Sequence, residues 1–150
     1  MNTEMQVAAS APVQVLSFVV GKEEYAIEIL RVQEIKCYTS ITPIPNAAPH
    51  IKGVMNLRGA VVPVVDLRVR FGLSAAACTP LTVIILVALK SKTVGFIVDA
   101  VSDVLQIAPE AVTPPPETGM APEQAFLSAI ARVDDRLFGL VDVDVVGNMA

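Results

Sequence analysis

The sequence predicts a mainly β protein built from two small barrels that lie side by side. Three observations favour this fold class. Apolar runs of strand length recur along the 150 residues, turn-forming glycine, proline and aspartate residues separate them, and both halves of the chain show the same theme. Apolar residues make up 53% of the chain, which argues against disorder. A chain of this length can bury a core without metals or disulfides.

The N-terminal part predicts a tail followed by strands. Residues 1–12 are small or polar and end at a proline, which is typical of a flexible tail. Val13–Val20 is rich in β-branched and aromatic residues and predicts a strand. Tyr25–Ile29 alternates like a strand that returns after a glycine turn. Leu30–Ile35 is compatible with a helical turn or a bent strand, and three prolines exclude a regular element from residues 41–49.

Ile51–Leu67 predicts a hairpin whose corner is Asn56–Gly59. Gly59 can adopt a positive φ without steric cost, so the two flanking apolar runs read as strands joined by a tight turn. The guanidinium of Arg58 at this corner must reach a carboxylate, backbone carbonyls or water. A salt bridge to Glu34, a carboxylate in a mostly apolar segment, would satisfy both groups. Arg58 is either a structural clamp or a group held ready for a partner, and residue chemistry alone favours the clamp.

The remaining chain predicts the same kinds of element. Leu67–Phe71 suits one or two helical turns that Gly72 ends, and residues 109–122 hold five prolines and predict a loop. Residues 74–80 predict a small-residue linker. The other expected elements are strands over Leu81–Leu89, Thr93–Val98 and Leu105–Ile107, a helical turn over Asp99–Val104, a hairpin of Phe126–Val133 and Leu137–Val141, and a short helix over Asp142–Asn148.

Four acidic residues are predicted to lie where a strand passes into a helical turn. They are Glu28, Asp66, Asp99 and Asp142. A carboxylate at such a junction accepts hydrogen bonds from free helix N–H groups, which contributes ~1 kcal/mol. Capping therefore explains these carboxylates better than acid–base catalysis does.

Charge and composition exclude several function classes. The net charge is −4 and no basic block occurs, which argues against nucleic acid as a partner. No apolar run approaches the about 20 residues of a membrane helix, and no secretion signal is visible. His50 is the single histidine and no phosphate-binding glycine loop occurs, so we expect no catalytic residues, metal, cofactor or small-molecule substrate. Cys37 and Cys78 lack ligand spacing and are expected to be reduced thiols, Cys37 packed in a strand.

Several motifs, in order, resemble those of the CheW-type chemotaxis coupling proteins. The hairpin carries three of them, Ile51-Lys52-Gly53-Val54, Asn56-Leu57-Arg58-Gly59 and Val64-Val65-Asp66-Leu67-Arg68. The resemblance covers about residues 13–147, and the chain looks like the free-standing form of the family because it starts at its own methionine. Further matching segments are Val32-Gln33-Glu34-Ile35, Ile41-Thr42-Pro43-Ile44-Pro45 and Gly95–Val104.

The resemblance implies a fold and a function. The fold is two five-stranded SH3-like barrels in one domain over residues 13–150. The function is that of a non-enzymatic cytoplasmic adaptor, which links the regulatory domain of the histidine kinase CheA to the cytoplasmic tip of methyl-accepting chemotaxis proteins in membrane-associated arrays. One alternative is a CheW-like adaptor of another kinase array, for example in twitching motility. An alternative of another class is a small-molecule binder or enzyme in a β-barrel.

The resemblance also implies two binding faces. The receptor-contacting groove would involve Val32, Glu34, Arg58, Gly95 and Val104. The kinase-contacting surface would lie mainly on the first barrel, near Ile41, Pro43, Ile44 and Gly53. Exposed strand edges and a groove between lobes are common protein docking sites. An aspartate in place of Gly53 is expected to harm assembly through an unpaired charge.

Overall fold

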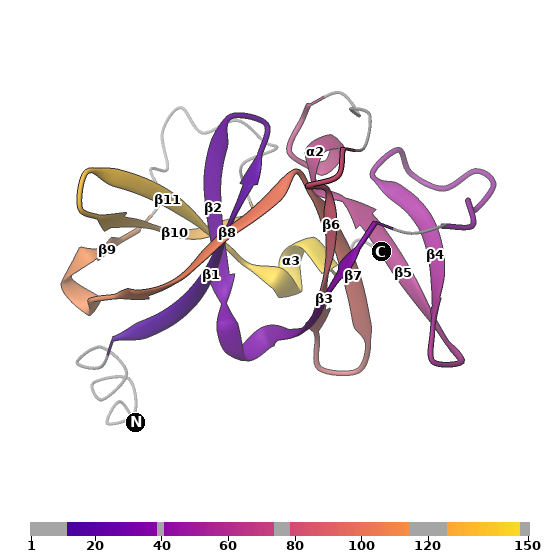
Figure 1. Ribbon diagram of the computed structural model, residues 1–150, viewed down its shortest axis with the longest axis horizontal. Helices are drawn as coiled ribbons and strands as arrows, with labels where there is room; N and C mark the ends of the chain where they lie inside the picture. The colour runs from indigo at the N-terminus through magenta and orange to yellow at the C-terminus, as the bar shows by residue number, and fades with distance from the viewer. Residues whose placement is uncertain (1–11, 39–40, 74–78, 115–125, 148–150) are drawn as a thin grey trace.

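The computed structural model describes residues 12–38, 41–73, 79–114 and 126–147. It confirms a mainly β architecture of two sheets, each forming its own lobe, and Figure 1 shows the two lobes side by side with helix α3 (Val143–Gly147) between them. None of the helices in the described part of the chain has the length and hydropathy of a membrane-spanning segment. The predictions for the N-terminal tail, for residues 74–78, for most of the proline-rich loop and for Cys78 fall outside the described residues.

The first lobe is a six-stranded sheet, here called the six-stranded lobe. Its strand order is β8-β1-β2-β11-β10-β9, and every neighbouring pair is antiparallel except β11 with β2. The sixth strand, β9, adds only two residues at one edge. The strands are β1 (Val13–Val20), β2 (Glu23–Glu28), β8 (Ala100–Ile107), β9 (Val112–Thr113), β10 (Leu127–Val133) and β11 (Arg136–Val141). A 3-10 helix, η2 (Pro109–Ala111), precedes β9.

The second lobe, here called the five-stranded lobe, has the order β3-β6-β7-β5-β4. Its only parallel neighbours are β5 and β7. Its strands are β3 (Val32–Cys37), β4 (Ile51–Leu57), β5 (Ala60–Asp66), β6 (Val83–Ala88) and β7 (Thr93–Val98). A 3-10 helix, η1 (Ile29–Arg31), leads into β3, so the segment that suited either a helical turn or a bent strand contains both; α2 (Leu67–Arg70) follows β5.

The lobes are not consecutive halves of the chain, which corrects the expectation drawn from the apparent repeat. β1 and β2 share a sheet with the last four strands, and the five strands between them form the other lobe. The chain crosses from one lobe to the other through η1 and again between β7 and β8. Two covalent connections therefore join the lobes.

The carboxylates at the strand–helix junctions act as expected at two positions. The Asp66 carboxylate accepts a hydrogen bond from Arg68 N at 3.0 Å at the start of α2. The Asp142 carboxylate accepts hydrogen bonds from the backbone N–H groups of Asp144 and Val145 at the start of α3. Glu28 precedes η1 but forms no side-chain cap.

The predicted helical turn over Asp99–Val104 is wrong, because these residues enter strand β8 directly. The Asp99 carboxylate instead accepts a hydrogen bond from Gly21 N at 2.7 Å, in the turn between β1 and β2. Asp99 N donates to Val19 O at 3.0 Å, which aligns the following residues with β1. The Asp99 carboxylate is thus satisfied by Gly21 and not by the N–H groups of a helix. The residues after Asp99 form a strand because they pair with β1.

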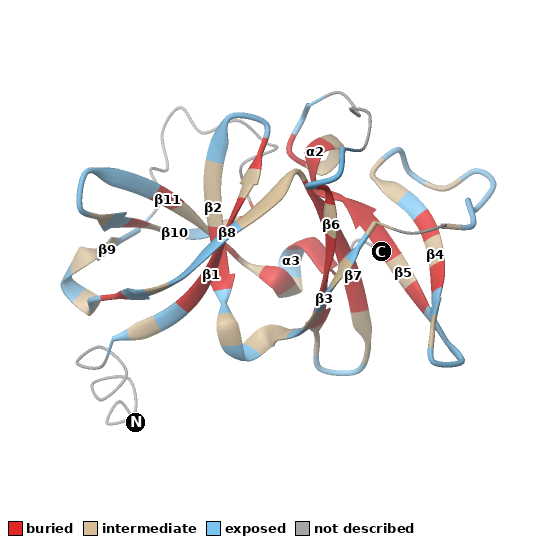
Figure 2. Ribbon diagram, in the orientation of Figure 1, coloured by how far each residue is buried: buried red, intermediate tan, exposed pale blue. Residues whose placement is uncertain are grey.

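Three groups of buried side chains form the core, and the largest lies between the lobes. Successive residues of β6 show how the sheet is used. Ile84 and Leu86 point into the five-stranded lobe, whereas Ile85 and Val87 join the interlobe core together with residues of the six-stranded lobe such as Phe18. Figure 2 shows buried segments where the lobes meet and along β4 and β5 of the five-stranded lobe. Burial on both faces explains why β6 reads as a continuous apolar run.

A buried ionic cluster adds a polar link between the lobes. The Arg68 side chain, only 3% exposed, donates from Nε to Asp66 Oδ1 and from Nη2 to Asp66 Oδ2, each at 3.0 Å. Arg68 Nη1 lies 3.4 Å from Asp99 Oδ1. Since Asp99 also binds the turn of the six-stranded lobe, the cluster connects α2 to both sheets.

Candidate functional site

The corner of the β4–β5 hairpin presents Arg58 at the surface. Arg58 and Gly59 both have positive φ, 50° and 89°, and lie between the paired residues Leu57 and Ala60. This is the geometry of the two-residue turn that matches the twist of a hairpin. Asn56 Oδ1 accepts a hydrogen bond from Gly59 N at 2.9 Å and fixes the turn. The hairpin corner is therefore confirmed, with its two turn residues at 58 and 59.

The structure confirms the predicted salt bridge between Arg58 and Glu34. Arg58 Nη2 lies 2.8 Å from Glu34 Oε1, and Lys36 Nζ lies 3.6 Å from Glu34 Oε2. Strands β3 and β4 are opposite edges of the five-stranded sheet, so this contact spans the two edges. The segment after β3 closes the same gap, because Thr42 forms an isolated bridge with Val54 of β4.

The charged pair is exposed on its arginine side. The Arg58 side chain is 71% exposed, whereas that of Glu34 is 31% exposed. The hydrogen bond and charge of Arg58 lower the pKa of Glu34, and the Glu34 carboxylate raises the pKa of Arg58. Both groups are thus ionised at neutral pH. The pair is compatible with both hypotheses for Arg58. It clamps two sheet edges together, and it leaves the guanidinium exposed for a partner.

The structure does not bring the whole predicted receptor set together at one surface. Val32 is half-buried and packs against the interlobe core. Gly95 is buried in β7, and a Cβ there would lie 2.8 Å from Ile84 Cγ2, inside the five-stranded lobe. Val104 is 54% exposed on β8, the edge of the other sheet. Of the predicted set, Glu34, Arg58 and Val104 thus lie at or near the surface, and Gly95 has a packing role.

The predicted kinase set gathers along β4 of the five-stranded lobe. Pro43 and Ile44 are exposed, and Ile41 packs partly against the core of this lobe. Gly53 is buried at a register shift of the β4–β5 pair, with φ 149°, and a Cβ there would lie 2.1 Å from the carbonyl oxygen of Thr42. Gly53 therefore allows the close approach of the segment that carries the exposed residues. This lobe is built from the middle of the chain and also carries Glu34 and Arg58.

One strongly exposed apolar side chain on the five-stranded lobe was missed by sequence reasoning. Val61 of β5 is 69% exposed, and its apolar neighbours Ala60 and Val62 conceal the alternation that would have identified it. Ile35 of β3, a candidate contact residue from the sequence, is 43% exposed. The expectation that Cys37 is packed within its strand is wrong, because it is an exposed free thiol on the edge strand β3.

The described residues contain no cluster of three or more potential metal ligands. His50 is half-buried before β4, and its carbonyl oxygen accepts a hydrogen bond from Asp66 N at 2.8 Å. The backbone of His50 therefore helps to hold the start of the hairpin.

Comparison with known proteins identifies the family. The CheW-like domain profile matches residues 14–149. The chain belongs to the CheW-like domain family. It is 39% identical over 133 residues to the chemotaxis protein CheW of Rhizobium meliloti, covering 89% of this chain and 86% of the relative. It is 41% identical over 129 residues to that of Klebsiella aerogenes, covering 86% and 78% of the two chains.

A solved member of the CheW-like family shares the fold. The crystal structure of the scaffolding protein TtCheW from Thermoanaerobacter tengcongensis matches with a TM-score of 0.80 and 35% identity, covering 87% of this chain and 88% of the other. The expected mainly β fold of two SH3-like lobes is thereby confirmed, with a small sixth strand in one lobe. These relatives identify this CheW-like domain as a chemotaxis adaptor or scaffold.

Proposed function

We propose that this CheW-like protein couples the histidine kinase CheA to the cytoplasmic tip of methyl-accepting chemotaxis proteins. Its similarity to proteins named chemotaxis protein CheW carries this proposal, because it extends over most of the chain and through both lobes. An adaptor of this kind acts without enzymatic activity, in the cytoplasm, at arrays recruited to the membrane. It works by holding two other proteins in a fixed relation.

Two features of the surface support a docking role. The ion pair of Arg58 and Glu34 presents an exposed guanidinium at the corner of a hairpin. Ile35 and Val104 are exposed apolar side chains on strands β3 and β8, each the edge of its sheet. Ile35 pairs with Ile85 and Val104 pairs with Leu16, and both partners belong to the interlobe core. We assign the receptor tip to this margin of the interlobe core and the kinase to the surface around Pro43 and Ile44.

The shared core supports a mechanical role for the adaptor. Residues from both sheets pack into one core between the lobes, so the two proposed faces are held by the same packing. A change in the receptor contacts at one face can therefore shift the preferred arrangement of the kinase at the other face. The size of the shift equals the difference in contact free energy between the two signalling states. Charged groups at such a face fix orientation more than affinity.

Co-sedimentation tests the proposal directly. Membranes that carry chemoreceptors are mixed with CheA and the full chain, and the pellet is analysed for each protein. We expect kinase to sediment with receptor membranes only when the chain is present, and this protein to sediment with receptor in the absence of kinase. Loss of both results would overturn the proposed function. Binding to the kinase of another sensory array, with none to CheA, would identify the alternative adaptor instead.

A further inference from the structure

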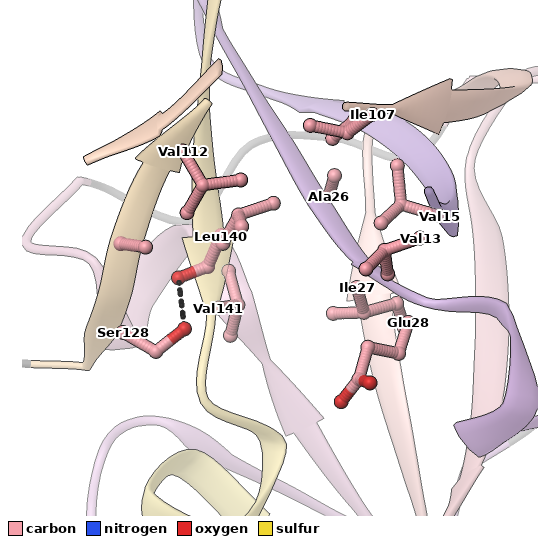
Figure 3. Close-up of a pocket in the computed structure, with 11 residues that line it drawn as sticks. Val13, Val15, Ala26, Ile27, Glu28, Ile107, Val112, Ser128, Leu140 and Val141 are labelled. Carbon is pink, nitrogen blue, oxygen red and sulfur yellow. Dashed lines mark hydrogen bonds between the residues drawn. The ribbon is translucent and has the colours of Figure 1, made fainter. Parts of the chain in front are cut away.

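The six-stranded lobe contains an apolar cavity of about 270 Å³ that its own side chains leave unfilled. The core of this lobe is small, and Phe138 is its only aromatic member. Side chains from all six strands line the cavity, and most are small, so they do not meet across it (Figure 3). The apolar lining residues include Val15, Ala26, Ile107, Val112, Ala129 and Leu140.

The cavity has an apolar end and a polar end. Figure 3 shows Ile107 and Val112 at one end, and Ser128 and Glu28 at the end nearest the C-terminal helix. Ser128 Oγ donates a hydrogen bond to Leu140 O at 3.3 Å, so this hydroxyl already has a partner. Glu28 thus supplies the carboxylate of the cavity wall.

A second hollow of about 230 Å³ continues from the polar end. It shares Glu28, Ser128 and Val141 with the apolar cavity and adds Arg31, Asp142, Val143 and Asp144. Three carboxylates therefore line it against one guanidinium. That guanidinium is already used, because Arg31 Nη2 lies 2.6 Å from Asp144 Oδ1 and Arg31 Nε donates to Ala88 O at 2.9 Å.

The remaining acidic groups differ in how they are occupied. Asp142 Oδ1 accepts two backbone hydrogen bonds of α3. Among the described residues, no hydrogen bond or ion pair holds the Glu28 carboxylate, which acts on Arg31 only by longer-range attraction. These carboxylates do not converge closely enough to hold a metal ion. The polar end is thus suited to an organic cation with an apolar group behind it.

We propose that this lobe binds a small amphiphilic amine, with its aryl or alkyl group in the apolar cavity and its ammonium group beside Glu28. The volume is sufficient, since an engineered apolar cavity of about 150 Å³ binds benzene. The mouth of a small β-barrel is a common place for such ligands. The site is separate from both proposed docking faces and does not depend on the adaptor function.

Three matched ligands test the site on the full chain. 2-Phenylethylamine, 2-phenylethanol and phenylacetate share one ring and differ in the charge of the head group. In NMR titrations of isotope-labelled protein, we expect the amine to bind most tightly and phenylacetate least, with shifts at Val15, Ala26, Ile107 and Leu140. Equal affinity for the amine and the acid, shifts confined to other residues, or no response up to the solubility limit of the amine would overturn the proposal.

Two kinds of variant separate the polar and apolar parts of the site. Glu28→Gln, at an exposed position, should weaken amine binding roughly two- to fivefold, the range of an exposed ion pair, and leave 2-phenylethanol unaffected. Val112→Phe and Ala129→Leu extend half-buried lining residues and should each abolish binding of all three ligands. Retained amine binding in a cavity-filling variant that shows a native NMR spectrum would refute the placement, as would an unchanged amine preference in Glu28→Gln.

Discussion

Arg58 Nη2 lies 2.8 Å from Glu34 Oε1, although the two residues belong to elements at opposite edges of the five-stranded sheet. The contact spans the gap between β3 and the β4–β5 turn. Its arginine side remains largely exposed, so the pair contributes little to folding in the way that exposed ion pairs generally do. The pair fixes the direction of the Arg58 guanidinium, which can then donate hydrogen bonds to carboxylates or carbonyl groups of a partner.

We predict that Arg58→Ala leaves folding nearly unchanged and weakens binding to receptor or kinase. The side chain is exposed and its turn is fixed by Asn56 and Gly59, so its removal disturbs little packing. Urea midpoints should match the wild type, and pull-down with receptor membranes or CheA should fall. Arg132→Ala, which removes an exposed arginine of β10, is the matched control and should bind normally. Unchanged binding to both partners would remove Arg58 from the docking site.

Gly53→Ala should destabilise the protein strongly. Its φ is 149°, and an added Cβ would lie 2.1 Å from Thr42 O, a backbone atom that cannot move without breaking the Thr42–Val54 bridge. An unpaired charge is therefore unnecessary to explain the harm expected of Gly53→Asp. Urea unfolding should show a lower midpoint for both variants.

Gly59→Ala is the control for backbone strain without a clash. Gly59 also has a positive φ, 89°, but apart from its own two chain neighbours no residue places a heavy atom within 4 Å of the position that its Cβ would occupy. Its substitution should cost only the strain of the turn, of order 1 kcal/mol. If the two alanine variants were equally stable, close packing at Gly53 would not be its reason for being glycine.

Sequence reasoning succeeded where a local rule and the tertiary structure agree. The β4–β5 corner follows from Arg58-Gly59 and Asn56, whose turn chemistry acts over four residues. The Glu34–Arg58 bridge followed from the cost of leaving a guanidinium unpaired among apolar neighbours. Both predictions depend on chemistry that few residues can satisfy.

Sequence reasoning failed where contacts with a distant part of the chain determine the local structure. Asp99 has the sequence of a helix cap, yet it binds Gly21 and the residues after it pair with β1. The apparent repeat likewise hid the true division, because pairing of β2 with β11 depends on contacts between the two ends of the chain. The interlobe core and the ionic cluster at Arg68 also join distant segments, and no short pattern encodes them.

Arg68→Met should lower the free energy of unfolding strongly, because Arg68 is buried. It leaves the Asp66 carboxylate, 2% exposed, without its bidentate partner. Removing one member of a buried pair typically costs about 3–5 kcal/mol. Arg31→Met, which breaks the more exposed pair with Asp144, is the control and should cost less in urea unfolding.

The double variant Asp66→Asn with Arg68→Met distinguishes an ionic contribution from lost packing. Replacing both charges removes the uncompensated carboxylate, so the double variant should be more stable than Arg68→Met alone. If the loss of stability in the double variant equalled the sum of the losses in Asp66→Asn and Arg68→Met, the two residues would not be energetically coupled.

Acid should weaken the contact between η1 and α3, which the Arg31–Asp144 ion pair makes. The hydrogen bond from Arg31 lowers the pKa of Asp144, more than desolvation raises it. A carboxyl whose pKa is lower in the folded state contributes stability above its unfolded pKa, about 3.9, and loses it as the pH falls through the folded value. Asp144→Asn should therefore be less stable than the wild type at neutral pH, and this difference should shrink as the pH falls below about 3.9. Asp135→Asn, in the exposed β10–β11 turn, removes a carboxyl with the same change in net charge. Urea unfolding at a series of pH values measures the free energy of unfolding of each variant. Asp135→Asn should stay close to the wild type throughout. A stability difference between Asp144→Asn and the wild type that widened in acid would contradict the assigned ion pair.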